Sequence, residues 1–383
     1  MQVSNNYPSD LGAKHGTLPH IGNHRSENGH PGGNAPGHLE AEEAGRRAGA
    51  GRQENSRKDF IMDTENRDQL LSAIKYLALR KTAPTRTEFL KKWAKDEQLL
   101  DSELGAMVSN GLIVQSEGVY SLTAEGRRLA QQNDAREFGA WMIACEQSTA
   151  YRELCRQLYG SERCQFDMLT QVQLEKLLDV LDIPGCQSIL DVGCGTGALT
   201  DYIAGHTSGK ITGIDFSPEA IAFARERTQE KQKRLSFQVM DMDELTFPSN
   251  SFDTVLCIDT LYFVNDLDKT MNTLRGSLQE QGQMGIFFSA KIAVNEPKEK
   301  LLPENTVLAK ALEKCGMQYE TWDFTAEEKE LWKQSLEIAN DLKDRFVEEG
   351  NLAIYEGRIG EAAREIEFSD TDRRRRYLFH AWL

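Results

Sequence analysis

The distribution of apolar residues divides the chain into a polar N-terminal stretch and a long patterned remainder. Residues 1–58 are rich in Gly, His, Asn, Glu and Arg and show almost no aliphatic periodicity, which predicts a disordered tail. From Arg67 onward, apolar residues recur at helical spacing. Three helices are predicted in turn: RDQLLSAIKYLALR, TRTEFLKKWAKDE and LLDSELGAMVSNGLI. The runs LIVQ and VYSL, joined by SEG, then predict a small hairpin.

Three helices followed by a hairpin resemble a winged helix, which we place at residues 62–130. The lysines and arginines of LKKWAK and GRRLA favour DNA binding. The third helix, however, is flanked by acids where a DNA-reading helix is normally basic: Asp96, Glu97, Asp101 and Glu103. The resemblance to the N-terminal module of some small-molecule O-methyltransferases implies two other roles, a homodimer contact or a lid over an active site. All three roles stay open.

Beyond a helical connector at residues 131–185, short apolar runs alternate with helical stretches up to residue 383. This alternation predicts an α/β fold with a parallel sheet. The expected strands are CQSILDV, KITGID, LSFQVMD, FDTVLCID, GQMGIFFSA, MQYETWDFT and YLFHAWL. A helical insertion at about 325–366 separates the last two, and together with residues 148–168 it is expected to cover the substrate. The run DTDRRRR before the last strand is expected to be solvated, with contact to an anionic substrate as the alternative.

The stretch DVGCGTG lies where the first strand turns into a helix. Gly193, Gly195 and Gly197 allow the backbone to approach a ligand and to adopt φ values that other residues resist. A dinucleotide-binding loop has the pattern G-x-G-x-x-G, whereas the pattern here is D-x-G-x-G-x-G. A carboxylate at Asp191 is awkward beside a pyrophosphate but suits an ammonium group. The loop therefore predicts a nucleoside ligand with a charged amino-acid end.

Further acids follow at the ends of the next strands, and the whole set resembles class I S-adenosylmethionine-dependent methyltransferases. The resemblance implies a Rossmann-like, seven-stranded sheet and S-adenosylmethionine as the cofactor. It places the methionine part on the glycine loop, the ribose hydroxyls on Asp215, the adenine on Asp241 and Met242, and the sulfonium end near Asp259. The full set of expected cofactor-binding residues is Asp191, Gly193, Cys194, Gly195, Gly197, Asp215, Phe216, Asp241, Met242, Asp259, Tyr151 and Gln165. In the family, a Pro-Gly turn usually precedes the fifth strand, and here QEQGQ replaces it.

Methyl transfer from a sulfonium is an in-line displacement that needs alignment more than a dedicated base. Tyr262 and His380 are the candidate catalytic residues, the latter as a substrate contact in the last strand. We expect a small-molecule acceptor with a reactive nitrogen or oxygen, an amine suiting the acidic chain. Two alternatives are an RNA or protein methyltransferase and a ligand-sensing DNA-binding regulator.

Composition narrows the remaining choices. A net charge of -15 disfavours nucleic acid as a partner. The chain contains neither an apolar run of membrane-spanning length nor a signal-peptide core, so a cytoplasmic protein without membrane contact is expected. Seven scattered cysteines without a C-x-x-C pair indicate reduced thiols and predict no metal site.

Overall fold

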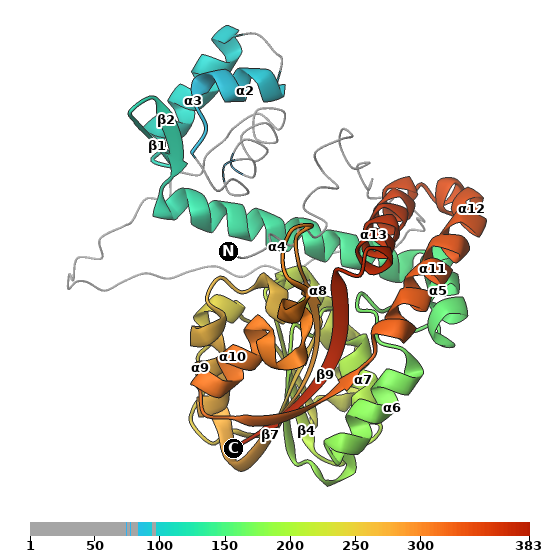
Figure 1. Cartoon of the computed structure of the whole chain (residues 1–383). Helices are drawn as coiled ribbons and strands as arrows, with labels where there is room; N and C mark the ends of the chain where they lie inside the picture. The colour runs from blue at the N-terminus through green and yellow to red at the C-terminus, as the bar shows by residue number, and fades with distance from the viewer. Residues whose placement is uncertain (1–73, 75–76, 78–82, 94–96) are drawn as a thin grey trace, which may run out of the picture.

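A small N-terminal module and a larger α/β body are joined by one long helix, α4 (Ala124–Gln147), as Figure 1 shows. The structure is a computed structural model that describes residues 74, 77, 83–93 and 97–383. The tail predicted at residues 1–58 and most of the first helix predicted for the N-terminal module lie outside these residues. Within the described part, no helix combines the length and apolarity that a membrane crossing needs.

The described part of the module consists of two helices and a hairpin. These are α2 (Arg86–Trp93), α3 (Glu97–Ser109), β1 (Ile113–Ser116) and β2 (Val119–Leu122). The strands pair antiparallel, and Phe89 packs edge-on against Tyr120 with ring centroids 5.7 Å apart. The Thr123 side chain accepts from the N–H of Gly126 and so starts α4 directly after the hairpin. The second and third predicted helices and the hairpin therefore form, while the winged-helix assignment stays a prediction.

The body is built on a seven-stranded sheet of mostly parallel strands, which confirms the expected α/β class. The strands are β3 (Ser188–Val192), β4 (Lys210–Asp215), β5 (Leu235–Val239), β6 (Phe252–Ile258), β7 (Leu278–Lys291), β8 (Gln318–Asp323) and β9 (Arg374–Trp382). Their order across the sheet is β5-β4-β3-β6-β7-β9-β8. The strand β9 follows the helical insertion and enters between β7 and β8, antiparallel to both.

Two strand boundaries differ from the sequence-based expectation. β5 ends at Val239, two residues before Asp241, which instead caps the short helix Met242–Glu244 by accepting from the N–H of Asp243. β7 starts early at Leu278 and incorporates the unusual QEQGQ stretch. Its register against β6 shifts there, since Phe252 pairs with Leu278 and Thr254 with Gln283. The departure from the family's turn thus appears as an irregularity within a strand pair.

Helices cover both faces of the sheet, as the alternation of side chains along buried strands requires. On one face, Ile189 and Leu256 pack with α6 (Gln171–Val180), α7 (Ala198–Ala204) and α8 (Pro218–Arg227). On the other, Leu190 and Val255 pack with α9 (Leu267–Ser277) and α10 (Val307–Lys314). The two apolar layers bury both faces of the sheet, and polar groups gather at its carboxyl edge.

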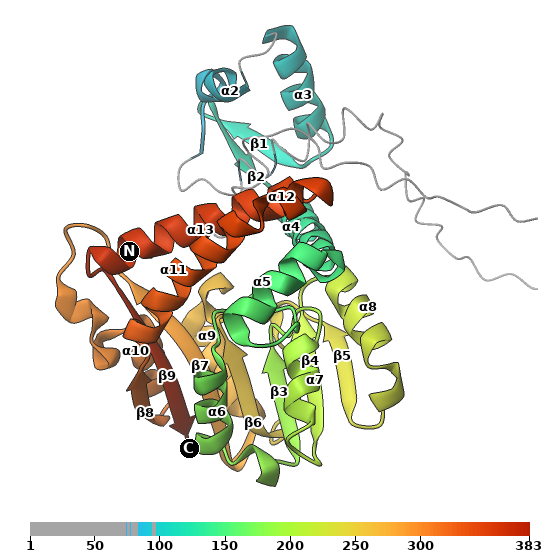
Figure 2. The ribbon, with the colours of Figure 1, turned by 90° about the vertical axis from the view of Figure 1, so that its right-hand side faces the viewer.

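A helical cap lies above that carboxyl edge (Figure 2). It consists of α5 (Thr149–Tyr159), α11 (Thr325–Asp341), α12 (Lys343–Glu348) and α13 (Leu352–Asp370), the last three from the predicted insertion. Trp332 and Phe346 are buried in its core together with Tyr151. Glu349 joins the two chain segments by accepting from Ser148 Oγ at 2.6 Å and from the N–H of Ala150 at 2.9 Å. The insertion therefore folds back onto the start of α5.

Candidate functional site

The glycine loop turns tightly between β3 and α7 at the carboxyl edge of the sheet. Gly193 and Gly195 have φ values of 76° and 53°, a region that favours glycine. The N–H groups of Gly193 and Cys194 both donate to the carbonyl of Ile214, at 2.8 and 2.9 Å. A Cβ atom on Gly193 would lie 2.3 Å from Thr260 Cγ2. Residue 193 is therefore a glycine for two independent reasons, backbone conformation and the close approach of Thr260.

Two buried carboxyl groups flank this loop at the ends of adjacent strands. Asp191 accepts from Thr200 Oγ1 at 2.6 Å, and burial raises its pKa to about 6, with Asp167 and Asp215 adding to the rise. Asp215 accepts from the N–H groups of Gly195 at 3.0 Å and Ser217 at 2.9 Å. Burial raises the pKa of Asp215 to about 6 as well. The structure thus brings together the first acid, the glycines and the second acid.

The loop is covered from above by α4 and by the segment before α6. A Cβ on Gly195 would lie 3.3 Å from Met142 Sδ and 3.8 Å from a ring carbon of Phe166. The Phe166 ring packs against Trp141, with centroids 5.4 Å apart. Phe216, which follows β4, packs against Phe138 of α4 at 6.1 Å. Met142 on α4 and Phe166 in the loop between α5 and α6 are ordinary apolar core candidates, so neither gave a sequence signal of its own.

Tyr151 and Gln165, expected as cofactor-binding residues, belong to the cover itself, where the Tyr151 ring stacks on Phe166 at 6.1 Å. The Tyr151 hydroxyl donates to the backbone carbonyl of Gln165 at 2.7 Å, and Gln165 Nε2 donates to the carbonyl of Leu169 at 3.0 Å. Both side chains are buried, so their polar atoms hold the covering segment in shape. The structure thereby gives them a positioning role behind Phe166.

Polar contacts also join α4 to the glycine loop, and they could not be predicted from the sequence. Glu146 of α4 accepts from Thr196 Oγ1 at 2.6 Å and from Arg227 at 2.6 Å. Thr196 belongs to the glycine loop, and Arg227 to the last turn of α8. Three segments that are 31 to 81 residues apart therefore meet at one carboxylate. Contacts over such distances in the chain leave no local pattern in the sequence.

At the end of β6, Asp259 sits in the left-handed region with a φ of 54°. Its two carboxylate oxygens accept from Arg376 of β9 at 2.7 and 2.8 Å. The Tyr262 hydroxyl donates to Asp259 at 2.9 Å and accepts from the N–H of Ser289 at 2.7 Å. Burial raises the pKa of Tyr262 well above its usual value, so the phenol stays protonated. Tyr262 therefore holds Asp259 in place. Its hydroxyl is protonated and hydrogen-bonded on both sides, so it does not serve as a base.

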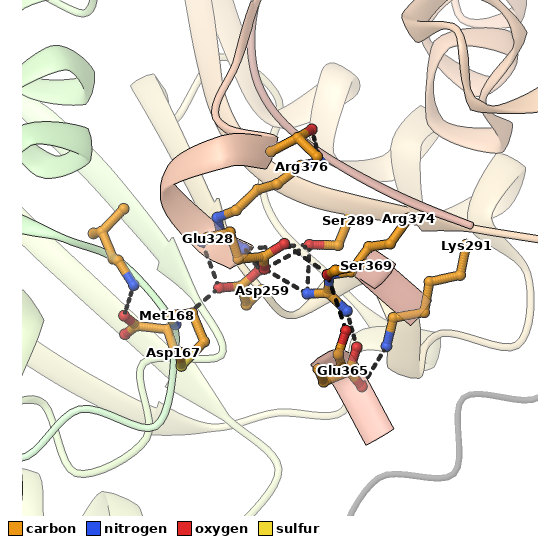
Figure 3. A network of polar contacts seen from close by, with 12 residues as sticks. Asp167, Met168, Asp259, Ser289, Lys291, Glu328, Glu365, Ser369, Arg374 and Arg376 are labelled. Carbon is orange, nitrogen blue, oxygen red and sulfur yellow. Dashed lines mark hydrogen bonds and ion pairs between the residues drawn. The ribbon is translucent and has the colours of Figure 1, made fainter. Parts of the chain in front are cut away.

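Asp259 and Tyr262 open onto a small hollow at the carboxyl edge, drawn in part in Figure 3. Its volume is about 250 Å³, including the solvent at its mouth. The lining residues come from five separate segments: Met168, Asp259, Tyr262, Ser289, Lys291, Glu328, Arg374 and Arg376. Most of these residues were not predicted as site residues. A charged residue is expected at the surface unless the sequence also shows its partner, and here the partners lie far apart in the chain.

The arginines in this hollow correct one expectation. DTDRRRR was expected to be solvated, but Arg374 and Arg376 are only 4% and 0% exposed. Strand alternation explains the difference, since Arg375 points the other way and pairs with the exposed Asp372. Arg374 pairs with Glu328 and Glu365, which supply the opposite charges that a buried guanidinium needs.

His380, expected as a substrate contact, is not among the residues that line this hollow. It lies four residues further along β9 than Arg376, about 13 Å down the strand at the usual rise per residue. Its ring nitrogens contact Gln283 at 2.8 Å and Glu320 at 3.2 Å. The antiparallel direction of β9 carries the residue away from the carboxyl edge, which the sequence pattern did not reveal.

The remaining expected residues lie around the glycine loop and the next strand. Cys194 is packed against Gly213 of β4, and burial raises the pKa of its thiol. Met242 follows β5 and packs on the apolar core of the sheet, with its carbonyl accepting from Thr270. Asp241 stands beside it as the cap described above. These positions follow the strand order β5-β4-β3-β6, so the expected adenine, ribose and sulfonium groups are reached one after another along the edge.

Sequence comparison agrees with this geometry. Residues 189–282 match the family model described as methyltransferase domain. The chain is 36% identical over 123 residues to malonyl-[acyl-carrier protein] O-methyltransferase of Acetivibrio thermocellus, a match covering 30% of this chain and 42% of that protein. It is 34% identical over 92 residues to phosphoethanolamine N-methyltransferase of Triticum aestivum, covering 24% and 18%. The chain therefore spans less than half the length of these two curated relatives.

Solved structures agree on the fold. Phosphoethanolamine N-methyltransferase 2 of Haemonchus contortus, determined with phosphomonomethylethanolamine and S-adenosylhomocysteine, superposes with a TM-score of 0.50 at 21% identity. That match covers 61% of this chain and 57% of the other. A mycolic acid cyclopropane synthase with bound S-adenosylhomocysteine gives a TM-score of 0.52 at 13% identity, covering 64% and 98%.

The strand order, the glycine loop and the strand-end acids define a class I methyltransferase fold. Residues 189–282 accordingly form a methyltransferase domain, and the two superposed structures hold S-adenosylhomocysteine, the demethylated form of S-adenosylmethionine. The residues present fit that group. Asp191 and Asp215 offer carboxylates, Gly193 leaves no side chain in the way, and Thr260 Oγ1 is buried without a partner among the described residues.

The raised pKa of Asp215 predicts a pH dependence for cofactor binding. A carboxylate accepts hydrogen bonds from ribose hydroxyls, whereas protonation removes an acceptor, so affinity should fall about fivefold from pH 6 to pH 5. Calorimetric titration with S-adenosylmethionine at pH 5, 6 and 7.5 checks this. The ligand-free protein should respond oppositely: a folded-state pKa above the unfolded value of about 3.9 means that Asp215 contributes more stability as pH falls from 6 toward 4. A flat affinity profile in the native protein would contradict the assignment, and Asp215→Asn should reduce the pH dependence to the part contributed by Asp191, whose pKa is also about 6.

Proposed function

We propose that the protein transfers the methyl group of S-adenosylmethionine to a nitrogen or oxygen of a small-molecule acceptor bound in the hollow beside the glycine loop. The proposal rests on one observation: the glycine loop and the hollow are contacted by two consecutive residues, Thr260 and Asp259. Thr260 lies against Gly193, while Asp259 lines the hollow. An acceptor in the hollow would therefore stand next to the loop that takes the methionine end of the cofactor.

The protein's own residues supply binding and orientation. Asp191 and the loop would hold the methionine part, Asp215 the ribose hydroxyls, and Asp241 with Met242 the adenine. The bound cofactor supplies a methyl group on a sulfonium, which is already a good leaving group. Met142 and Phe166 of the cover, and the cap formed by α5, α11 and α13, would exclude water from the reacting atoms.

The nucleophile needs no strong base on the protein. Asp259 is occupied by Arg376 and Tyr262, and the pKa of Tyr262 is raised well above its usual value, so neither group is free to remove a proton. An amine that arrives neutral can attack without help, and an acidic hydroxyl can attack after ionising in solution. This supports positioning as the main contribution of the chain.

The charge distribution supports a small acceptor over a nucleic acid. The net charge of the chain is -15. In the N-terminal module, Arg86 is paired with Glu97 at 3.0 Å and Asp101 at 2.7 Å, so this arginine is already neutralised by α3.

Asp215→Ala tests the cofactor part of the proposal. Losing a buried charged acceptor should weaken S-adenosylmethionine binding about tenfold to a hundredfold, measured by calorimetry at pH 7.5. Asp268→Ala is the matched control, because the Asp268 side chain is half exposed and pairs with Lys314 on the surface. Unchanged affinity in Asp215→Ala, with a control that also binds normally, would remove Asp215 from the cofactor site. Failure of the native protein to bind S-adenosylmethionine at micromolar concentration would overturn the proposed function itself.

A further inference from the structure

Thr196 stands between two glycines of the loop, and the protein holds it at both its side chain and its backbone. Gly195 and Gly197 have φ values of 53° and 74°, and glycine loses more conformational freedom on ordering than any other residue. A loop of this composition is loose unless other groups fix it. The buried Thr196 hydroxyl donates to Glu146 at 2.6 Å, and the Thr196 carbonyl accepts from Arg227 Nη1 at 3.3 Å.

The two groups that hold Thr196 also pair with each other. Glu146 accepts from Arg227 Nη2 at 2.6 Å, so the three residues form a closed ring of hydrogen bonds. The Glu146 side chain is only 4% exposed. A hydrogen bond to a charged group that water does not reach is stronger than one at the surface. The ring therefore fixes the loop residue that lies between the two glycines.

Glu146 occupies a place that neither helix stability nor burial favours. It lies in the last turn of α4, where the negative end of the helix dipole disfavours a carboxylate. It is also nearly inaccessible to solvent, and a buried carboxylate lowers stability unless it is paired. An apolar residue here would suit the helix and its surroundings better. The contact with the loop gives this position a reason to be an acid.

Glu146 lies outside the residues that match the methyltransferase domain, 189–282. Met142 comes one turn earlier on α4 and faces Gly195, so one side of the helix rests on the loop. At the other end of the same helix, Ala130 is buried in the core of the N-terminal module. The cofactor loop is therefore positioned by a helix that begins in the N-terminal module.

We propose that Glu146 is a positioning residue for the cofactor, which acts through Thr196 to hold the glycine loop ready for the amino-acid end of S-adenosylmethionine. This inference rests on the proposed function, which places that end of the cofactor on the loop. The hold extends one residue further, because the N–H of Gly195 donates to Asp215 at 3.0 Å. A loop that is ordered before the ligand arrives loses less conformational entropy on binding, so the affinity is higher.

The test measures two ligands by calorimetry with the full chain: S-adenosylhomocysteine and methylthioadenosine, which keeps the adenosine part but lacks the amino-acid end. Glutamine has one acceptor oxygen where the ring uses two. Glu146→Gln and Thr196→Val should each weaken S-adenosylhomocysteine about tenfold and methylthioadenosine less than about threefold. Thr196→Ser keeps the hydroxyl and should restore the affinity. Glu125→Gln is the matched control, since Glu125 is half exposed in the first turn of α4 and pairs with Arg128.

The double variant Glu146→Gln with Thr196→Val shows whether the first residue acts through the second. If it does, the double variant should bind S-adenosylhomocysteine about as well as the weaker single variant, because one contact is lost only once. Losses that multiply to about a hundredfold would mean that the two residues act independently and would overturn the proposal.

The other outcomes separate this inference from the proposed function. Native affinity for S-adenosylhomocysteine in Glu146→Gln would overturn the positioning role, and equal weakening of both ligands would overturn it in favour of a general effect on the fold. Failure of the native protein to bind S-adenosylhomocysteine would overturn the proposed function itself. Thermal unfolding shows whether each variant is folded. If Glu146→Gln is not, Thr196→Val decides the point, because it leaves the pair of Glu146 and Arg227 intact.

Discussion

Arg376→Met is expected to lower the free energy of unfolding by about 3–5 kcal/mol, because it leaves a buried carboxylate without its partner. Arg376 is fully buried and donates to both oxygens of Asp259, at 2.7 and 2.8 Å. It also donates to Gln173 at 3.2 Å and thus links β9 to α6. Methionine fills a similar volume but offers no donor. Urea unfolding at pH 7, analysed with a common slope, measures the loss.

Arg375→Met is the matched control, since the neighbouring residue differs only in the face of the strand it occupies. Arg375 pairs with Asp372 at 2.6 Å, both side chains being partly exposed, and such a surface pair contributes about 0–1 kcal/mol. The double variant Arg376→Met with Asp259→Asn should recover part of the stability, because the unpaired charge is then removed as well. A loss below about 1 kcal/mol in Arg376→Met would show that the buried pair is not held as the structure has it.

Gly193→Ala is expected to lower stability by about 2–5 kcal/mol and to weaken S-adenosylmethionine binding at least about tenfold. The left-handed φ of 76° costs an alanine about 1–2 kcal/mol. The new methyl group would lie 2.3 Å from Thr260 Cγ2, an overlap that adds about 1–3 kcal/mol and moves the loop from Thr260. Because the loop and the end of β6 are in contact here, a displacement at either side changes the cofactor site. Urea unfolding and calorimetric titration measure the two effects separately.

Gly160→Ala provides the comparison that isolates the steric part. Gly160 has nearly the same φ, 72°, but a Cβ there would have no heavy atom within 4 Å among its surroundings. It ends α5 in the cap, away from the glycine loop. This variant should lose only the backbone component of about 1–2 kcal/mol and should bind S-adenosylmethionine normally. Equal losses in the two variants would indicate that Thr260 yields easily and that the loop tolerates a side chain at residue 193.

Those parts of the molecule that depend on near neighbours in the chain could be predicted from the sequence. The strand before the glycine loop, its turn and the following helix are set by apolar spacing and by the conformations that only glycine adopts readily. The position of Asp191 and Asp215 followed from the same rule, because consecutive parallel strands deliver their carboxyl ends to one edge of the sheet. The fold class could therefore be inferred from local patterns, whereas the cofactor was implied by the resemblance of the whole set of strand-end residues to class I S-adenosylmethionine-dependent methyltransferases.

The acceptor hollow, in contrast, is a product of tertiary structure. Arg374 and Arg376 lie in a run of four arginines that resembles a solvated surface segment, and their burial depends on Glu328 from α11 and Asp259 from β6. Those partners are 46 and 117 residues away in the chain. Which arginines turn inward depends on how β9 pairs between β7 and β8, since a strand alternates its side chains and a shift by one residue would exchange them. The same antiparallel entry removes His380 from the site. The sequence by itself thus determined the cofactor loop, and the long-range pairing of one strand decided what the adjoining hollow can bind.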